Sequence, residues 1–396
     1  MIHYLLIVLF FLCLIWVYFK EHSLVHPAIV TLIVWLSMLV AYKIFDHGLY
    51  DLSKRFYGAL ALYVFPFVGF SLLGSKLKMD VRRSTFAEIP RQYVNLMTYI
   101  VIVCLIVTII AYFITVGVSF STLLYDARTN FVEKEQKGVL ILSREFYFFE
   151  KIAGVSSSFF LFYYMYNKKM VRLSYILLAG VLFYFCLRAD KTSFLSFGLG
   201  LVCILYLKGI SLKNILLAVF LLLGLITCLQ LLRDMQDLDY IGKFFAIYFL
   251  SPMTAFDHVL NMSSQWVTFF SGENLFGYIA DWFNLLPDDF SPQSVNPNDN
   301  WVHVPLPTNV FTVMFNPYKD WGYPGIFCFG IVYGFVWGIL YKLSKLNDKF
   351  KIFYISSFWM LVLQFFADWL NWSFLLQMFI LFFVLFNLPR LFKLTK

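Results

Sequence analysis

The sequence predicts an all-α polytopic membrane protein, and three observations support this fold class. The 396 residues are 61% hydrophobic, against about 45–50% in ordinary soluble domains. Charged residues make up only 14% of the chain, and the mean hydropathy is +0.76. The apolar residues also form long continuous runs. These observations exclude a soluble enzyme, a nucleic-acid-binding protein and a disordered chain.

About eleven transmembrane helices are expected. A bilayer core about 30 Å thick needs roughly 20 apolar residues per helix. Runs of this kind are helical because lipid offers the backbone no outside hydrogen-bond partner. The first run has neither the basic flank nor the small-residue cleavage site of a signal peptide, so it counts as a helix. The expected spans are 2–19, 27–45, 57–73, 94–117, 146–166, 173–188, 192–207, 214–232, 325–341, 352–370 and 373–388.

Basic residues predict the orientation, because cytoplasmic loops are enriched in Lys and Arg. With the N-terminus outside and the C-terminus inside, the cytoplasmic segments hold 18 of the 31 Lys and Arg residues but 4 of the 23 acidic residues. The formal net charge of +8 is therefore interpreted first as a topology signal. A missed span would invert everything that follows it.

The spans divide the chain into three regions. Residues 1–232 hold helices one to eight with a first outer loop at 118–145, residues 233–324 form a large outer loop, and residues 325–396 hold helices nine to eleven. Two segments of the large loop are expected to be short helices lying in the membrane interface. They are 241–250, which Pro252 is expected to end, and 275–286, whose apolar residues share one face.

The sequence contains no recognisable metal or nucleotide motif. The six cysteines fall in or beside the spans and are interpreted as small apolar filler. There is no phosphate-binding loop and no zinc-protease motif. No metal and no cofactor are therefore expected.

Charged residues accompany two short spans. Arg172 and Arg188 lie sixteen residues apart, or about 24 Å along a helix, and Lys191 and Lys208 are about as close. Both arms are shorter than the bilayer core, so the turn from Arg188 to Lys191 is expected below the outer surface. Its charges either pair with Asp190 to close the turn or bind an anion at headgroup depth.

Three more arginines are expected near the same level: Arg128 and Arg144 in the first outer loop, and Arg233 at the end of span eight. Each alone is compatible with an ordinary surface role. Together with Arg188 and Lys191 they form a cationic set, and the planar guanidinium suits phosphate oxygens. A lipid-linked phosphate or diphosphate is the anion expected at this depth.

The large loop also holds aromatic and titratable candidates. Tryptophans at an interface are mostly membrane anchors, but a flat ring also stacks on sugars, and Trp301 in the proline-rich segment is the best candidate, with Trp321 further along. His303 is either solvated or a base at neutral pH. Thr308 and Asn309 either position a substrate or cap the adjoining helix.

A family resemblance accompanies these residues. The stretch VPLPTNVFTVMFNPYKDWGYPGI at 304–326 and the turn LRADKTSF at 187–194 resemble segments of bacterial O-antigen polymerases of the Wzy type. Arg128 and Arg144 each precede a glycine by ten residues, a spacing also found in this family. The topology is similar along most of the chain, whereas the residue-level similarity is confined to these patches.

The resemblance implies a GT-C-like helical bundle in the bacterial inner membrane with its active site facing the periplasm. Such enzymes transfer a growing glycan from undecaprenyl diphosphate to the non-reducing end of a new lipid-linked repeat unit. The implied partners are the two undecaprenyl-diphosphate-linked oligosaccharides and membrane lipids, and no nucleic acid. A chain-length regulator is an optional further partner of such enzymes. The cationic set would bind the diphosphate, and His303, Asp299 or Asp320 would act as a base.

Other functions stay open. An O-antigen ligase or another lipid-linked glycosyltransferase would share this chemistry and differ in the acceptor. A flippase for lipid-linked oligosaccharides would be expected to carry charges along a central cavity, whereas this chain concentrates its polar groups at one face. A non-enzymatic scaffold is the remaining alternative.

Overall fold

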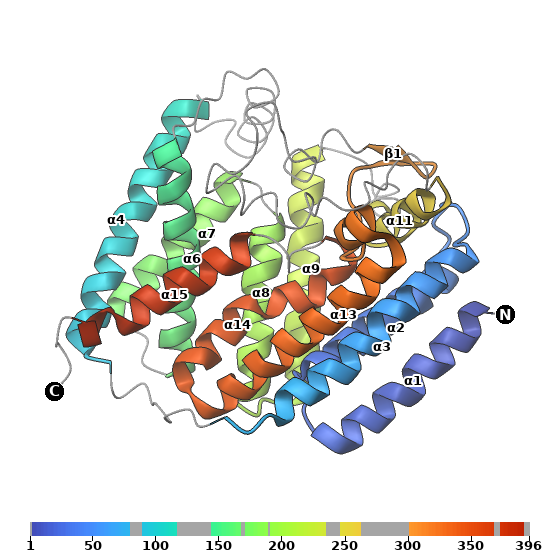
Figure 1. Cartoon of the computed structure of the whole chain (residues 1–396). Helices are drawn as coiled ribbons and strands as arrows, with labels where there is room; N and C mark the ends of the chain where they lie inside the picture. The colour runs from blue at the N-terminus through green and yellow to red at the C-terminus, as the bar shows by residue number, and fades with distance from the viewer. Residues whose placement is uncertain are drawn as a thin grey trace. The chain divides into compact units, whose positions relative to one another are not determined.

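A computed structural model describes residues 2–79, 89–116, 144–167, 171–188, 191–234, 246–262, 301–367 and 373–391 (Figure 1). The chain divides into two compact units. Unit 1 comprises Met1–Val81, Leu238–Lys345 and Met360–Gln377, and unit 2 comprises Arg82–Asp237, Leu346–Trp359 and Met378–Lys396. Each unit thus combines segments from the three regions expected along the chain.

Unit 1 holds three long helices from the N-terminal region and a group of elements from the large loop. Its elements are α1 (Ile2–Glu21), α2 (Pro27–Ile44), α3 (Lys54–Lys76), a π-helical turn η3 (Ala246–Leu250), α11 (Ser251–Asn261), the two-residue strands β1 (Val302–His303) and β2 (Pro307–Thr308), most of α13 (Phe315–Leu346) and a 3₁₀ turn η5 (Leu363–Phe365). The strands pair antiparallel, with Val302 opposite Thr308.

Unit 2 is a bundle of antiparallel helices. It contains α4 (Arg91–Val116), α6 (Arg144–Tyr166), α7 (Arg172–Arg188), α8 (Lys191–Leu207), α9 (Leu212–Asp234), most of α14 (Asp348–Val362) and most of α15 (Ser373–Leu391). Phenylalanine rings from α6, α14 and α15 form part of its core. Phe159 lies 5.8 Å from Phe382 and 6.4 Å from Phe353 between ring centroids.

Each of the eleven expected spans contains a helix. Within the described residues, five helices are long and apolar enough to cross a membrane, namely α1, α2, α3, α4 and α13, and four further apolar helices are shorter. These properties identify a helical membrane protein. Most ends fall within three residues of expectation, because a continuous apolar run fixes where a helix lies.

Three details differ from the expected helices. Helix α13 begins at Phe315 but its backbone is not helical at Gly322, so the part after this break agrees with the expected start at 325, and the short helical segment before it was not expected. The tenth helix changes to the 3₁₀ turn η5 after Val362 and ends before Ala367, whereas residues 368–370 lie outside the described residues. Pro252 lies in the first turn of α11 and does not end a helix, because a missing N–H costs nothing there.

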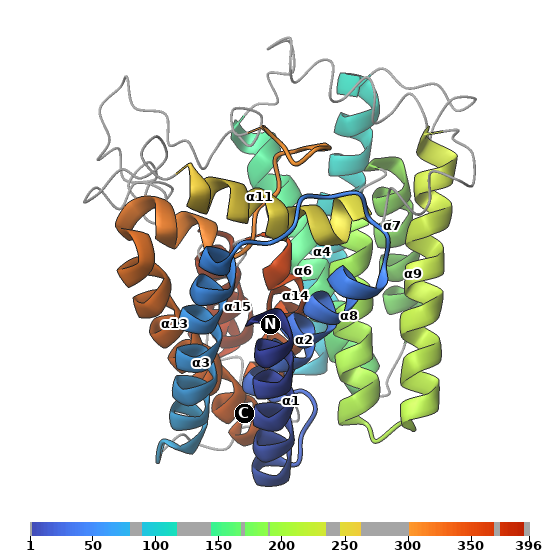
Figure 2. The same ribbon diagram turned by 90° about the vertical axis from the view of Figure 1, so that its right-hand side faces the viewer.

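Helices α3 and α13 pack with close backbone contact in unit 1 (Figure 2). A Cβ added to Gly334 would lie 2.3 Å from the carbonyl oxygen of Phe67, and one added to Gly338 would lie 2.3 Å from that of Ser71. Gly330 faces Tyr63 in the same way. Glycines four residues apart let two membrane helices meet backbone to backbone.

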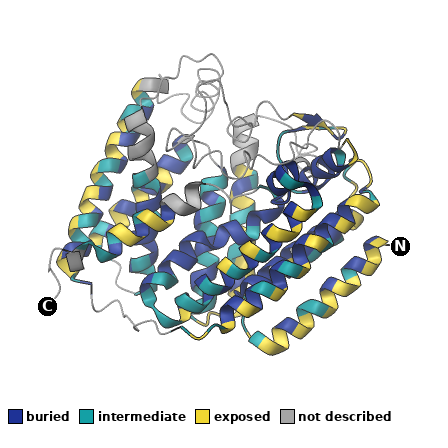
Figure 3. Ribbon diagram, in the orientation of Figure 1, coloured by how far each residue is buried: buried dark blue, intermediate teal, exposed yellow. Residues whose placement is uncertain are grey.

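The surface of unit 1 contrasts with this interior. Only 22% of the most apolar 18-residue stretch of α1 is buried, and most of the large apolar side chains of this helix are exposed (Figure 3). In a soluble protein such a face would aggregate, whereas in a membrane it faces lipid. The exposed apolar surface therefore agrees with the composition.

Candidate functional site

The expected cationic set maps to the helix ends of unit 2. Arg144 begins α6, Arg188 ends α7, Lys191 begins α8, and Arg233 is the second-last residue of α9. Successive helices run in opposite directions and pack on one another, so these four positions share one end of the unit. The side chains of the three arginines, and the whole of Arg128, lie outside the described residues.

At the opposite end of unit 2, the ends of α6 and α8 lie at the same height along the helix axes. Lys208, directly after α8, donates a hydrogen bond from Nζ to the main-chain carbonyl of Met165 near the end of α6. A short turn then leads into α9, with Gly209 at a φ of +70° that favours glycine. Helix lengths measured from this end therefore show how far each helix extends toward the cationic end.

The lengths place the turn between α7 and α8 below its neighbours. α7 and α8 have 17 residues each, whereas α6 and α9 have 23 each. The difference of six residues corresponds to about 9 Å along the helix axis. The structure thus confirms the expected bounds of both short arms, and Arg188 and Lys191 flank a recessed turn.

Lys191 is buried, with 9% of its surface exposed. A buried ammonium group in a membrane protein is costly and is normally compensated by a partner or an anion. It also lies at the start of α8, where unpaired backbone N–H groups and the helix dipole already favour a negative charge. The first turn of α8 therefore has the polarity at which helices commonly bind anions.

The expected acid–base and sugar-stacking residues belong to unit 1. The hairpin of β1 and β2 carries His303, whose side chain is exposed, and Trp301 just before β1 is 50% exposed. Asn309 is half-buried after β2. These three residues share one short segment, and Asp299 lies outside the described residues.

Thr308 has a structural partner. Its hydroxyl accepts a hydrogen bond from the hydroxyl of Ser251 at 3.3 Å and another from the backbone N–H of Val310. Thr308 is buried, with 3% exposure. These contacts attach the hairpin to the first residue of α11.

Asp320 and Trp321 lie in the first part of α13, before a break at Gly322, whose φ of +62° and ψ of −147° are not helical. Asp320 is fully buried. The indole of Trp321 stacks on Phe329 with 5.6 Å between ring centroids, so that ring packs inside the fold. Glycine is required at both positions of this break, because the φ of Gly322 is positive and a Cβ on Gly325 would lie 2.1 Å from the carbonyl oxygen of Pro317.

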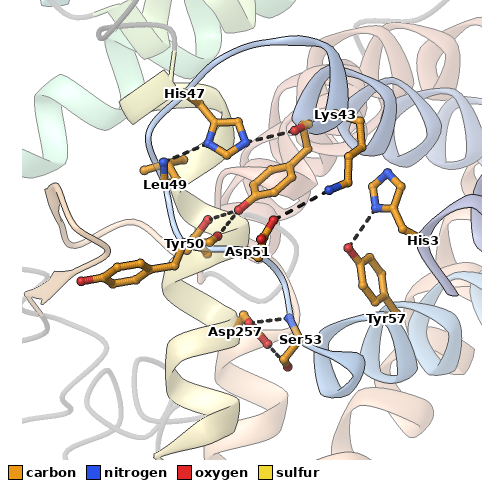
Figure 4. A network of polar contacts seen from close by, with 11 residues as sticks. His3, Lys43, His47, Leu49, Tyr50, Asp51, Ser53, Tyr57 and Asp257 are labelled. Carbon is orange, nitrogen blue, oxygen red and sulfur yellow. Dashed lines mark hydrogen bonds and ion pairs between the residues drawn. The ribbon is translucent and has the colours of Figure 1, made fainter. Parts of the chain in front are cut away.

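Sequence reasoning missed a polar network that positions α11 (Figure 4). Ser53, which caps the N-terminus of α3, donates from its backbone N–H and its hydroxyl to the Asp257 carboxylate at 2.8 and 2.5 Å. Tyr42 shares a hydrogen bond of 3.2 Å with Thr254. Ser251, Thr254 and Asp257 recur at helical spacing and so mark a polar face of α11, but this spacing does not identify the partners of that face.

Asp257 is the titratable group of this network. Burial raises its pKa above the ordinary aspartate value of 3.8, although the two hydrogen bonds from Ser53 act in the opposite direction. Arg55 extends the attachment by donating to the carbonyl of Leu260 at 2.9 Å. The network therefore holds the helix below the hairpin of His303 in place.

Among the described residues, no group of three His, Cys, Asp or Glu side chains is placed to hold a metal ion. Comparisons with protein-family models, with curated proteins and with solved structures give no match. The two groups of residues with the clearest chemistry are the recessed cationic turn of unit 2 and the hairpin of unit 1.

Proposed function

We propose that the chain is a membrane glycosyltransferase that polymerises undecaprenyl-diphosphate-linked oligosaccharide repeat units. The observation that carries this proposal is the recessed turn between α7 and α8. Arg188 and Lys191 flank it, about 9 Å below the first residue of α6 and the last residue of α9. The helix ends at Arg144 and Arg233 add two more cationic positions at the same end.

The recess suits a lipid-linked diphosphate. The diphosphate of such a carrier lies at headgroup depth, below the outer ends of long transmembrane helices. Lys191 supplies a buried positive charge and the first turn of α8 supplies N–H donors. Arginine forks complete the recognition of phosphate oxygens.

The chemistry requires this charge. The acceptor hydroxyl attacks the anomeric carbon of the donor sugar, the bond from that carbon to the diphosphate oxygen breaks, and the electron pair leaves with the diphosphate. Negative charge grows on the leaving oxygens, and fixed cations stabilise it more strongly in the transition state than in the ground state. The hydroxyl proton passes to a base, for which His303, Asp299 and Asp320 are the candidates.

The finer features of the fold are part of the same proposal. Eleven helices cross the inner membrane in a GT-C-like bundle, with the N-terminus in the periplasm and the C-terminus in the cytoplasm. The resemblance to Wzy-type polymerases and the positions of the basic residues support this arrangement. Trp301, exposed beside the hairpin, is available to stack on a sugar ring of the substrate.

The test is a reconstituted reaction with lipid-linked repeat units as both donor and acceptor. Wild-type protein should yield a ladder of polymer lengths, and Arg188→Ala, Lys191→Ala and Arg144→Ala should each reduce the ladder by roughly 10²-fold or more. Lys213→Ala is the matched control, because it removes an exposed lysine at the end of α9 opposite the cationic set. This variant should leave the ladder intact.

Each variant is first compared with wild type for its amount in the membrane and its elution as a single species. Normal ladders from all three cationic variants would refute the diphosphate site. Transfer to a lipid A core in place of a repeat unit would reassign the chain as a ligase.

A further inference from the structure

A second cationic cluster lies at another part of the molecule, at the Glu21 end of unit 1. Lys20 and Glu21 are the last two residues of α1, and Lys76 is the last residue of α3. The Nζ of Lys76 lies 3.9 Å from the Glu21 carboxylate. The fold therefore brings Lys76 to the end of α1 that carries Lys20.

A third lysine joins this cluster through aromatic contacts. The Nζ of Lys345 lies 4.3 Å from the ring centroid of Tyr341, and the Tyr341 ring stands edge-on to His26 at 4.7 Å. On the other side, the Nζ of Lys20 lies 4.6 Å from the ring of Trp16. We call Lys20, Lys76 and Lys345, with the residues between them, the Lys20 cluster.

One carboxylate is shared within the Lys20 cluster. The two oxygens of Glu21 lie 3.9 Å from the Nζ of Lys76 and 3.9 Å from the Nε2 of His26. His26 adds no charge, because burial and then the charges of Lys345 and Lys76 lower its pKa to about 3. Its other nitrogen accepts a hydrogen bond from the backbone N–H of Ala28. The Lys20 cluster thus contains three positively charged lysines and one carboxylate.

We infer that the Lys20 cluster binds the phosphate headgroup of an anionic phospholipid in the adjoining membrane leaflet. Basic side chains between the ends of membrane helices recognise such headgroups. The Lys76 side chain is 51% exposed and Trp16 is 54% exposed, so the cluster opens outward. A bound phosphate would supply negative charge to a group whose three lysines share one carboxylate.

The surroundings favour a lipid over a free anion. The exposed apolar residues of α1 continue from Trp16 along the helix, with Leu12 at 56% and Ile15 at 38% exposure. Acyl chains attached to a phosphate at Lys20 would lie along this face. Trp16 itself is placed where tryptophans commonly lie, at the level of the headgroups.

The test compares lipid binding by the full-length chain and by two variants. Phosphatidylglycerol is added to delipidated protein in neutral detergent, and bound lipid is counted by native mass spectrometry while thermal unfolding is followed in parallel. Wild type should retain phosphatidylglycerol in preference to phosphatidylcholine. The double variant Lys20→Gln/Lys76→Gln should bind phosphatidylglycerol on the order of tenfold more weakly, and Lys213→Gln should bind as wild type does.

Further arms keep the inference falsifiable. Lys20→Arg/Lys76→Arg keeps the charges and should retain binding, which separates loss of charge from damage to the fold. Equal retention of phosphatidylglycerol by the Gln double variant and wild type would overturn the inference. Competition by millimolar inorganic phosphate as effective as the lipid would also overturn it, because the ligand would then be a free anion. Neither result bears on the glycosyltransferase assay.

Discussion

The Gln364 side chain joins two helices that lie far apart in the sequence. Its Oε1 accepts a hydrogen bond from the indole N–H of Trp35 at 3.2 Å, and its Nε2 donates to the hydroxyl of Thr31 at 3.0 Å. Its main-chain carbonyl accepts from the N–H of Val313 at 2.9 Å. All of these groups are buried in unit 1. The 3₁₀ turn that interrupts the tenth helix is therefore stabilised from both sides.

Gln364→Leu should destabilise the protein by about 1–3 kcal/mol, because it leaves the Trp35 indole N–H buried without an acceptor. Thermal unfolding in detergent measures the loss. Trp35→Phe removes the donor, so the double variant should lose less than the sum of the two single losses. Strict additivity would show that the hydrogen bond contributes nothing to stability.

Gly334→Ala should lower stability by about 1–3 kcal/mol, because its new Cβ would lie 2.3 Å from the carbonyl oxygen of Phe67 and push α3 away from α13. Gly69→Ala, on α3 itself, is the matched control, because a Cβ there meets nothing within 4 Å. The melting temperatures of the two variants are compared under one condition, and that of Gly334→Ala should be the lower. If both variants melt together, close backbone contact does not limit stability.

The stability of wild type should depend on Asp257 in a defined direction of pH. A raised pKa means that the folded protein holds the proton more tightly than the unfolded chain. The contribution of this group is therefore complete below the ordinary value of 3.8 and is lost as the pH rises through the raised pKa. The melting temperature of wild type should fall relative to that of Asp257→Asn over this range.

Asp51→Asn is the control for that experiment, since the Asp51 carboxylate belongs to the same loop region and is 94% exposed. Its melting curve should follow that of wild type at every pH. Parallel profiles for wild type and Asp257→Asn would contradict a proton held by the buried carboxylate.

Reporter fusions test the proposed orientation. A fusion in the turn at Gly209 should report the cytoplasm, as should one at Met170, because both turns lie between helices whose other ends carry the cationic set. Fusions at Ser121 and Asn298 should report the periplasm. A cytoplasmic signal from Asn298 would reverse the large loop and remove the hairpin from the periplasmic face.

The sequence predicted the helices well, because each apolar run must be helical in lipid and its charged flanks fix its ends. It did not predict the short helical segment between Phe315 and the break at Gly322, where Asn316, Pro317, Lys319 and Asp320 have the composition of a loop. These residues are nevertheless buried, and tertiary packing overrides local propensity there. It also missed the break at Gln364, since one glutamine in an apolar run leaves the helical pattern intact.

For the candidate site, the spacing of Arg172 to Arg188 and of Lys191 to Lys208 predicted two helices too short to cross the bilayer core. The turn between them was therefore expected below the membrane surface. The network of Ser53 and Asp257 was not predicted, because its partners are 204 positions apart and come together only in the fold. Long-range hydrogen bonds of this kind have no local pattern in a single sequence.

The contact between α3 and α13 also sets which substitutions relatives of this chain can tolerate. The lipid-facing residues of α1 can be exchanged among apolar types, because a fluid bilayer accommodates any shape. A methyl group at position 334 would clash with main-chain atoms of α3, and no substitution on α3 can remove those atoms. Substitutions should therefore accumulate rapidly along α1 and only rarely at Gly330, Gly334 and Gly338.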